Sequence, residues 1–143
     1  MNGSKARAVV DTGPLVALFS RADQYQHWAR EEFERLTPPV FTCEAVLSEA
    51  QLLVQERSGN PLAVLELVRR GVLNVAFELE DEVERLLELQ RAYADVPMSL
   101  ADACLVRMTE LHEHSRVMTT DPDFRIYRRN RRRVIPLLAP PGI

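Results

Sequence analysis

The stretch RAVVDTGPLVALF, residues 7–19, contains a short apolar run that ends at an acid. Ala8, Val9 and Val10 are typical of a buried strand, and Asp11 follows them directly. Thr12-Gly13-Pro14 then turn the chain, and an apolar helix pattern begins where proline suits the first turn. A carboxylate at the end of a buried strand is costly without a partner, which makes other acids in similar positions significant.

The composition is that of one folded domain. The chain has 143 residues, of which 46% are hydrophobic, so it is long enough for a single core and too short for two ordinary domains. We therefore predict one domain over residues 1–143. Apolar runs stay well below the ~18 residues of a membrane span, and the start, MNGSKARAVV, lacks the apolar stretch of a secretion signal. We expect a cytoplasmic protein without a membrane partner.

Charge and cysteine usage exclude several classes of function. The net charge is −3, so the chain has no global basic field. Lys5 is the only lysine, which excludes a phosphate-loop lysine and Schiff-base chemistry in the interior of the chain. Cys43 and Cys104 fit neither a zinc motif nor a redox pair, and we expect both to be buried thiols.

Short apolar segments alternate with helical patterns along the chain. The patterns predict strands at 7–11, 38–42, 72–79, 116–120 and 133–138, the last at an edge because of its proline. They predict helices from Pro14, at 24–36, from a Thr42 cap to 57, and at 60–71, 80–93 and 99–114. This order predicts an α/β fold with a parallel sheet of about five strands, covered by helices on both faces. Ligands bind beyond the carboxyl ends of such strands, where Asp11 and Asp121 lie.

Two further acids interrupt the apolar faces of predicted helices. Glu49 in TCEAVLSEAQLLVQE and Asp102 in MSLADACLVRM both have apolar residues three and four positions away, so we expect their carboxylates on the core side. Each acid also has a structural interpretation. Asp102 could complete a capping box with Ser99, and Glu49 could reach solvent or pair with an arginine. Asp11 could be a turn residue, and Asp121 could start a helix.

These structural interpretations do not explain the four acids together. Two strand ends and two helix faces each present a carboxylate, with no nearby lysine to neutralise them. A shared divalent cation would satisfy all four. Hard oxygen ligands favour Mg²⁺ or Mn²⁺, whereas zinc prefers cysteine or histidine.

The segments VVDTGPLVALF, TCEAVLSEA, SLADACLV and TTDPDF resemble, in order and spacing, the PIN domain, the ribonuclease fold of VapC-like toxins. The resemblance covers about residues 8–137 and implies the PIN-like three-layer fold. It assigns the metal-binding and catalytic roles to Asp11, Glu49, Asp102 and Asp121. Thr119 is then a polar neighbour of the last acid, and Asp123 is an extra carboxylate. Many members carry a serine where this chain has Gly13, so Thr12 becomes the candidate for that hydroxyl.

The resemblance also implies an activity and partners. It implies an Mg²⁺- or Mn²⁺-dependent endoribonuclease that hydrolyses RNA phosphodiester bonds, a possible cognate antitoxin and a homodimer. Residues 125–133 hold six arginines, a run typical of a solvated face. In the functional alternative, part of this run contacts RNA phosphates beside Asp121, through Arg128, Arg129, Arg131 and Arg132.

Two other classes of function compete with the nuclease. One is a PIN-fold module that binds RNA or protein without catalysis, against which the presence of all four acids argues. The other is a phosphohydrolase with an aspartyl nucleophile on the first strand. That class needs a second acid two residues after Asp11, where this chain has Gly13.

Overall fold

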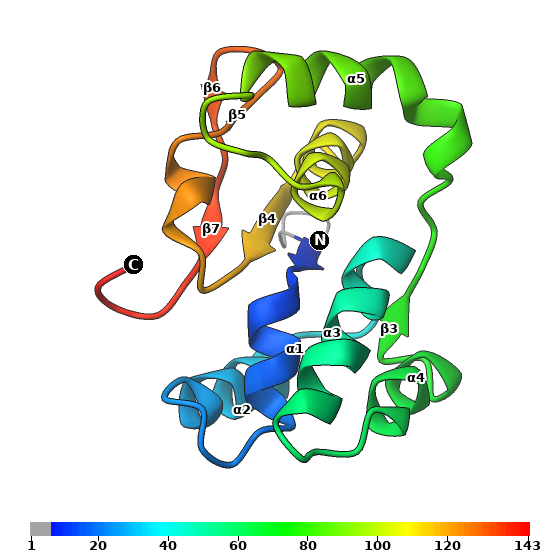
Figure 1. Cartoon of the computed structure of the whole chain (residues 1–143), viewed down its shortest axis with the longest axis vertical. Helices are drawn as coiled ribbons and strands as arrows, with labels where there is room; N and C mark the ends of the chain where they lie inside the picture. The colour runs from blue at the N-terminus through cyan, green and yellow to red at the C-terminus, as the bar shows by residue number, and fades with distance from the viewer. Residues whose placement is uncertain (1–6) are drawn as a thin grey trace, which may run out of the picture.

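The computed structural model describes residues 7–143 and contains a five-stranded parallel sheet flanked by helices (Figure 1). The strand order is β3-β2-β1-β4-β7, with bounds β1 Arg7–Val10, β2 Val40–Phe41, β3 Leu73–Asn74, β4 Ser115–Met118 and β7 Leu137–Leu138. The helices are α1 Thr12–Leu18, α2 Gln26–Arg35, α3 Glu44–Glu56, α4 Leu62–Arg69, α5 Val83–Ala92 and α6 Leu100–Leu111. The predicted fold class is confirmed, although the first six residues of the predicted domain lie outside the described residues.

The register of the two central strands positions the site. Val10 pairs with Met118 in the parallel β1–β4 ladder, so the residues after them emerge side by side. The Asp11 amide donates to the Met118 carbonyl at 2.9 Å, which extends the ladder by one bond. The carboxyl ends of β1 and β4 therefore meet at one edge of the sheet, as expected for parallel strands.

Several predicted elements differ in extent from the observed ones. Thr42 does not cap α3, because its hydroxyl donates to the Val10 carbonyl at 3.0 Å and so joins β2 to β1. The predicted strand 72–79 shrinks to β3, which can pair only along the two residues of β2. The predicted strand 133–138 divides into β6 (Arg133–Val134) and β7, and β7 takes the expected edge position.

The arginine-rich segment forms a small antiparallel hairpin that the sequence did not predict. In it, β5 (Arg128–Arg129) pairs with β6, and the turn uses Asn130 and Arg131 at positive φ. This hairpin is tied to α6 and α5 through Glu110, whose side chain is 2% exposed and accepts hydrogen bonds from Arg85 Nε at 2.9 Å and Nη2 at 2.7 Å. The Asn130 amide donates to the same carboxylate at 2.7 Å. One buried carboxylate thus connects three elements.

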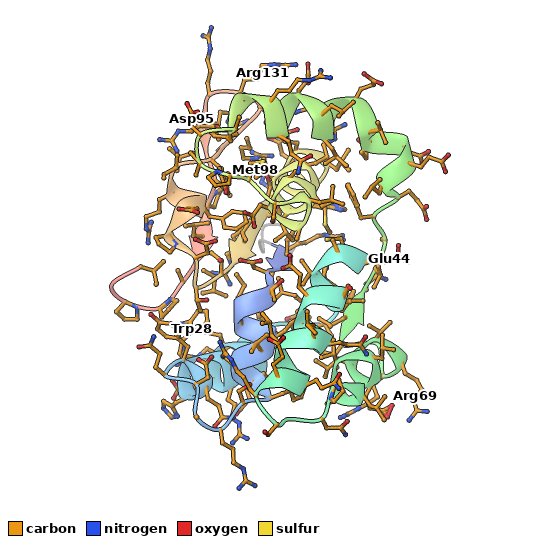
Figure 2. The ribbon with its side chains drawn as sticks, in the orientation of Figure 1. Trp28, Glu44, Arg69, Asp95, Met98 and Arg131 are labelled. Carbon is orange, nitrogen blue, oxygen red and sulfur yellow. The ribbon has the colours of Figure 1, made fainter. Side chains whose placement is uncertain are left out.

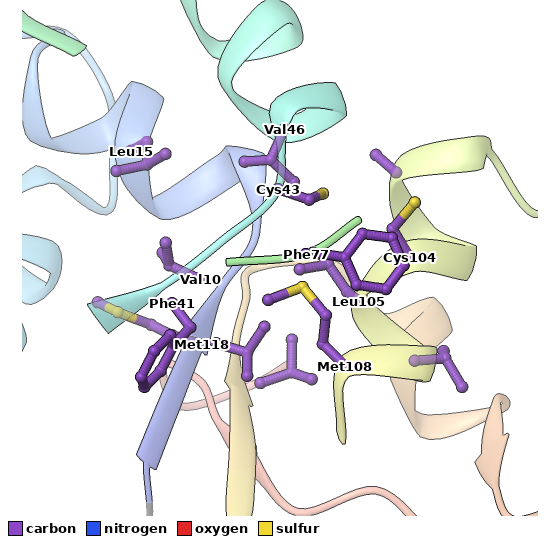
Figure 3. Packing of buried hydrophobic residues seen from close by; sticks show 14 of the residues in the cluster. Val10, Leu15, Phe41, Cys43, Val46, Phe77, Cys104, Leu105, Met108 and Met118 are labelled. Atoms are coloured by element: carbon purple, nitrogen blue, oxygen red, sulfur yellow. The ribbon is translucent and has the colours of Figure 1, made fainter. Parts of the chain in front are cut away.

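The core lies between the sheet and its helices and brings the two cysteines together. Figure 3 shows Cys43 at the start of α3 and Cys104 on α6 among Val46, Phe77 and Leu105. Both cysteines are buried and free, as expected, and they belong to the same core cluster although 61 positions separate them in sequence. In the described part of the chain, no helix is both long and apolar enough to cross a bilayer.

Candidate metal centre

Asp11 sits where β1 ends and α1 begins, and its carboxylate bonds both to the start of α1 and to the segment that follows β4. One oxygen, Oδ1, accepts the Thr12 amide at 2.7 Å and caps α1. The other, Oδ2, accepts the Thr119 hydroxyl at 2.7 Å, across the β1–β4 register. Asp11 is only 6% exposed. It is therefore both the turn residue of the structural interpretation and a buried acid at the sheet edge.

Glu49 reaches the same place from α3, but not from the core side. Its carboxylate accepts the Thr12 hydroxyl at 2.9 Å, so two of the predicted site residues bond to each other. The expectation that Glu49 faces the core is wrong, because the residue is exposed and its neighbour Leu52 is 57% exposed. Val46, Ala50 and Val54 make the buried stripe of α3 instead. Glu49 lies at the border of that stripe and faces an open pocket.

Asp102 occupies the first turn of α6 and serves two structural contacts. The Ser99 hydroxyl accepts the Asp102 amide at 3.0 Å, and the Asp102 carboxylate accepts the Ser99 amide at 3.5 Å, which completes the predicted capping box. The same carboxylate oxygen accepts the Tyr127 hydroxyl at 3.0 Å. Burial, reinforced by the adjacent carboxylate, raises the pKa of Tyr127, so the tyrosine remains a hydrogen-bond donor.

Asp121 follows β4 and is positioned through Thr119. The Thr119 hydroxyl accepts the Asp121 amide at 2.9 Å while it donates to Asp11, so one side chain orients two acids. The Asp121 carboxylate accepts the Asp123 amide at 2.9 Å and starts the 3₁₀ turn Pro122–Arg125. Phe124 in that turn is fully buried, which anchors the segment. Asp123 lies outside the pocket lining.

All four predicted acids line one open pocket with a volume of about 960 Å³. Burial, with smaller contributions from the charges of Asp102 and Asp121, raises the pKa of Asp11 to about 7 against the hydrogen bonds from Thr119 and Thr12. Burial and the charge of Asp121 also raise the pKa of Asp102. The charges of neighbouring acids therefore disfavour the ionisation of Asp11 and Asp102.

The donor set suits a hard divalent cation. It contains carboxylate and hydroxyl oxygens only, and a buried aspartate with a pKa near 7 is an acid that lacks a counter-charge. Among residues 7–143, however, no group of three or more His, Cys, Asp or Glu side chains is arranged to hold a metal ion. The acid oxygens are bonded to Thr12, Thr119 and Tyr127 instead. Joint coordination of one ion would require rotation of these side chains.

The arginine run lies away from this pocket. Arg129 is 3% exposed and donates to the Thr109 carbonyl, so its predicted contact with RNA phosphate is wrong: it is a core residue of the hairpin. Arg131 pairs with Glu88 of α5 at 3.1 Å, and Figure 2 shows it at the end of the molecule where α5 lies. Arg128 donates to three backbone carbonyls of its own turn. None of the hairpin arginines lines the pocket, and the phosphate contacts of Arg128, Arg131 and Arg132 stay predictions.

Sequence reasoning missed several residues of the site. Tyr127 and Thr120 contact the acid segments, and Arg57 lines the far side of the pocket beside Asp23. The glycine at position 13 was a sequence sign of a close contact at this point. A Cβ at this position would overlap the Thr120 hydroxyl oxygen, so the position that holds serine in many PIN domains here leaves room for Thr120. The spacing TTD after β4 was the only sequence hint to that hydroxyl.

Comparison with known proteins agrees with this geometry. The fold is similar to that of the *Mycobacterium tuberculosis* toxin VapC20, described as a sarcin-ricin loop cleaving toxin. The two chains share 23% identity with a TM-score of 0.73, over 81% of this chain and 91% of VapC20. Comparison with curated protein sequences finds no match. The family model of the PIN domain matches residues 8–130, which include all four acids. The chain therefore belongs to the PIN domain family.

Proposed function

We propose that this protein is an Mg²⁺- or Mn²⁺-dependent endoribonuclease, and that it acts in the cytoplasm as the toxin of a toxin–antitoxin pair. The observation that carries the proposal is the convergence of Asp11, Glu49, Asp102 and Asp121 on one pocket in a PIN domain. The similarity to VapC20 supports an RNA substrate. A cognate antitoxin and a homodimer belong to the same proposal, by analogy with VapC-like toxins.

The four acids would hold the cation, and the hydroxyl groups around them would orient the acids. A bound divalent ion lowers the pKa of water to near neutral and stabilises charge on an attacked phosphodiester. Thr119 holds Asp11 and the Asp121 backbone, while Thr12 holds Glu49 and Tyr127 holds Asp102. These contacts hold the acids at the pocket in the metal-free protein, and the side chains would rotate from them to ligate a shared ion. Hydrolysis would leave a 5′-phosphate and a 3′-hydroxyl.

A cleavage assay with matched variants tests the proposal. We expect the wild-type protein to cut single-stranded RNA with Mg²⁺ or Mn²⁺ and to stop in EDTA. Asp11→Asn and Asp102→Asn each remove a ligand charge, and we expect each to lower the rate by at least about a hundredfold. Asp95→Asn makes the same chemical change at an exposed position outside the pocket and should cleave normally.

Two results would overturn this assignment. One is metal-dependent cleavage by both site variants at the wild-type rate. The other is the absence of cleavage by the folded wild-type protein with either ion, which would favour a non-catalytic PIN module that binds RNA or protein.

A further inference from the structure

The pocket extends beyond the four acids to a second wall. This wall comes from the connection between α1 and α2 and from the end of α3, and it consists of Ser20, Asp23, Tyr25, Arg57 and Ser58, with neighbouring residues. Five carboxylates line the whole pocket, and Arg57 is the single cationic side chain among its described lining residues. We refer to this second wall as the Arg57 wall.

Asp23 holds Arg57 in place but occupies only one of its hydrogen-bond donors. Its Nη1 donates to Asp23 Oδ2 at 2.7 Å, and Asp23 Oδ1 accepts the Tyr25 amide at 2.8 Å. Both oxygens of Asp23 are thus committed within the protein. The Arg57 side chain is 49% exposed, and a guanidinium has five N–H donors, of which this pair uses one. The remaining donors can bind an acceptor in the pocket.

A close backbone approach builds the Arg57 wall. After α3, the chain turns at Ser58, with φ 63°, and passes against the end of α1 at Gly59. A Cβ at Gly59 would lie 2.9 Å from the Phe19 carbonyl oxygen and 2.8 Å from a Val54 methyl group. Only glycine permits this contact. The contact brings the residue after α3 next to the loop that holds Asp23.

Ser20 is a buried polar residue of the Arg57 wall. Its side chain is 4% exposed, lines the pocket, and its hydroxyl has no hydrogen-bond partner among the described residues. A buried polar group without a partner costs free energy and is unusual in a native protein. The Ser20 Oγ itself is closed to the pocket, so it is a polar atom buried behind the wall, and the exposed donors of Arg57 are the ones that face a bound molecule.

We propose that the Arg57 wall is a subsite that binds an RNA phosphate next to the scissile one, with Asp23 as the positioning residue for Arg57. This inference rests on the proposed function. A guanidinium matches the geometry of a phosphate, and RNA carries one phosphate per nucleotide. One strand can therefore present a phosphate to the acid cluster, through a divalent ion, and the next phosphate to Arg57. The hairpin arginines cannot bind this second phosphate, because the hairpin lies beside α5. Arg57 follows α3, which ends near α2 and α4 (Figure 1).

Fluorescence anisotropy with a labelled RNA hexamer tests the subsite without cleavage. All proteins carry Asp102→Asn and are measured with Mg²⁺. We expect Arg57→Met to raise Kd by about tenfold or more, since a charge-assisted hydrogen bond is lost. The slope of log K against log salt should become shallower by about 0.7, the value for one phosphate on single-stranded RNA. Arg35→Met is the matched control, because Arg35 also pairs with an acid, Glu32, but lies outside the pocket.

Hexamers with one uncharged methylphosphonate linkage locate the contact. The Asp102→Asn parent should lose affinity at two linkages, and the Arg57→Met variant should lose it at only one of them. Arg57→Lys, which keeps the charge without the planar fork, should restore most of the salt slope but only part of the affinity. A structural role for Arg57 would instead lower the affinity for every hexamer equally.

Three outcomes overturn the subsite. The first is equal RNA affinity in the parent and in Arg57→Met, and the second is absence of RNA binding by the parent. The third combines two results: hexaglutamate displaces the RNA only when Arg57 is present, and the RNA affinity does not depend on the charge of any linkage. Together they would mean that the Arg57 wall binds an acidic protein segment. Each of these is read from binding, so it is independent of whether the wild-type protein cleaves RNA.

Discussion

Asp11 is the residue on which the chemistry of the pocket depends. Its burial opposes ionisation, whereas the Thr119 hydroxyl and the Thr12 amide favour it. The balance leaves its pKa at about 7, so without a cation the side chain is about half ionised at neutral pH. A nearby divalent ion would favour the carboxylate. Proton loss at Asp11 and cation binding should therefore be coupled.

This pKa predicts a pH dependence of stability in EDTA. The Asp11 pKa rises from 3.8 in a model carboxylic acid to about 7 in the folded protein, so between these values the folded state binds more protons than the unfolded state. The free energy of unfolding should then fall as pH increases through this window, by a few kcal/mol at most. Urea denaturation at about pH 4.5 and about pH 7.5 measures the change.

Asn at position 11 cannot ionise, so Asp11→Asn should flatten this dependence and be the more stable protein at the higher pH. Asp95→Asn is the control and should keep the wild-type slope. A slope in Asp11→Asn equal to that of the wild type would mean that other groups cause the pH dependence.

At the residue scale, the sequence identified the acids but not their partners. Asp11 and Asp121 were recognisable because an acid follows an apolar strand, and Asp102 because it interrupts an apolar face. The Thr12–Glu49 bond joins residues 37 positions apart, and the Arg57–Asp23 pair joins residues 34 apart. Such contacts depend on how α1, α2 and α3 pack, which no local pattern encodes. Glu49 was placed on the wrong face for the same reason.

At the scale of elements, α1 approaches the segment after β4 closely. Gly13 in the first turn of α1 faces Thr120, which follows Thr119 at the end of β4. The absence of a side chain at position 13 lets the two segments approach. Asp11 lies two residues before Gly13, and Asp121 directly follows Thr120. The distance between Gly13 and Thr120 therefore affects the positions of both acids.

Gly13→Ala should therefore be destabilising. Its methyl group would overlap the Thr120 hydroxyl oxygen, and overpacking of this kind costs about 1–3 kcal/mol. Thr120→Ala removes that oxygen and leaves the Thr120 Cβ at 3.4 Å from the new methyl group, a tolerable contact. The double variant should recover most of the loss, as measured by urea unfolding of the two single variants and the pair.

Additive effects of the two substitutions would contradict this account, since they would place the cost of Gly13→Ala outside the contact with Thr120. Gly71→Ala is not a suitable control, because that glycine has φ +79° and its substitution is strained for a different reason.

Long elements were predicted more accurately than short ones. Long amphipathic helices such as α3 and α6 were placed within a few residues, because their periodicity extends over three turns or more. Two-residue strands such as β2 and β3 are defined by pairing with their neighbours, so the sequence overestimated them. The arginine hairpin was missed because its turn depends on two non-glycine residues at positive φ, Asn130 and Arg131.

At the scale of the whole molecule, the site joins two groups of elements that share one core. Asp11 and Glu49 belong to α1 and α3, whereas Asp102 and Asp121 belong to α6 and the end of β4. The second pair is supported from behind by α5 and the hairpin, through the Arg85–Glu110 contact. A cation held by acids from both groups would cross-link them, while without a cation the charges of Asp102 and Asp121 disfavour ionisation of Asp11.

Cation binding should consequently stabilise the entire fold. An ion present at about a hundred times its Kd adds about 2.7 kcal/mol, which for a chain of this size raises Tm by roughly 5 to 10 °C. We expect this increase when Mn²⁺ is added to the EDTA-treated wild-type protein, measured by differential scanning fluorimetry. Asp102→Asn should lose part of the increase, because one ligand charge is gone while Asp11, Glu49 and Asp121 remain to hold the ion more weakly.

Two controls separate site binding from a general effect of salt. NaCl at matched ionic strength should leave Tm nearly unchanged, and Asp95→Asn should respond to Mn²⁺ like the wild type. If Asp11→Asn and Asp102→Asn both kept the full Mn²⁺ response, the stabilising ion would be bound elsewhere. The four acids would then be a set of helix caps and hydrogen-bond acceptors, and their convergence on one pocket would have no metal to explain it.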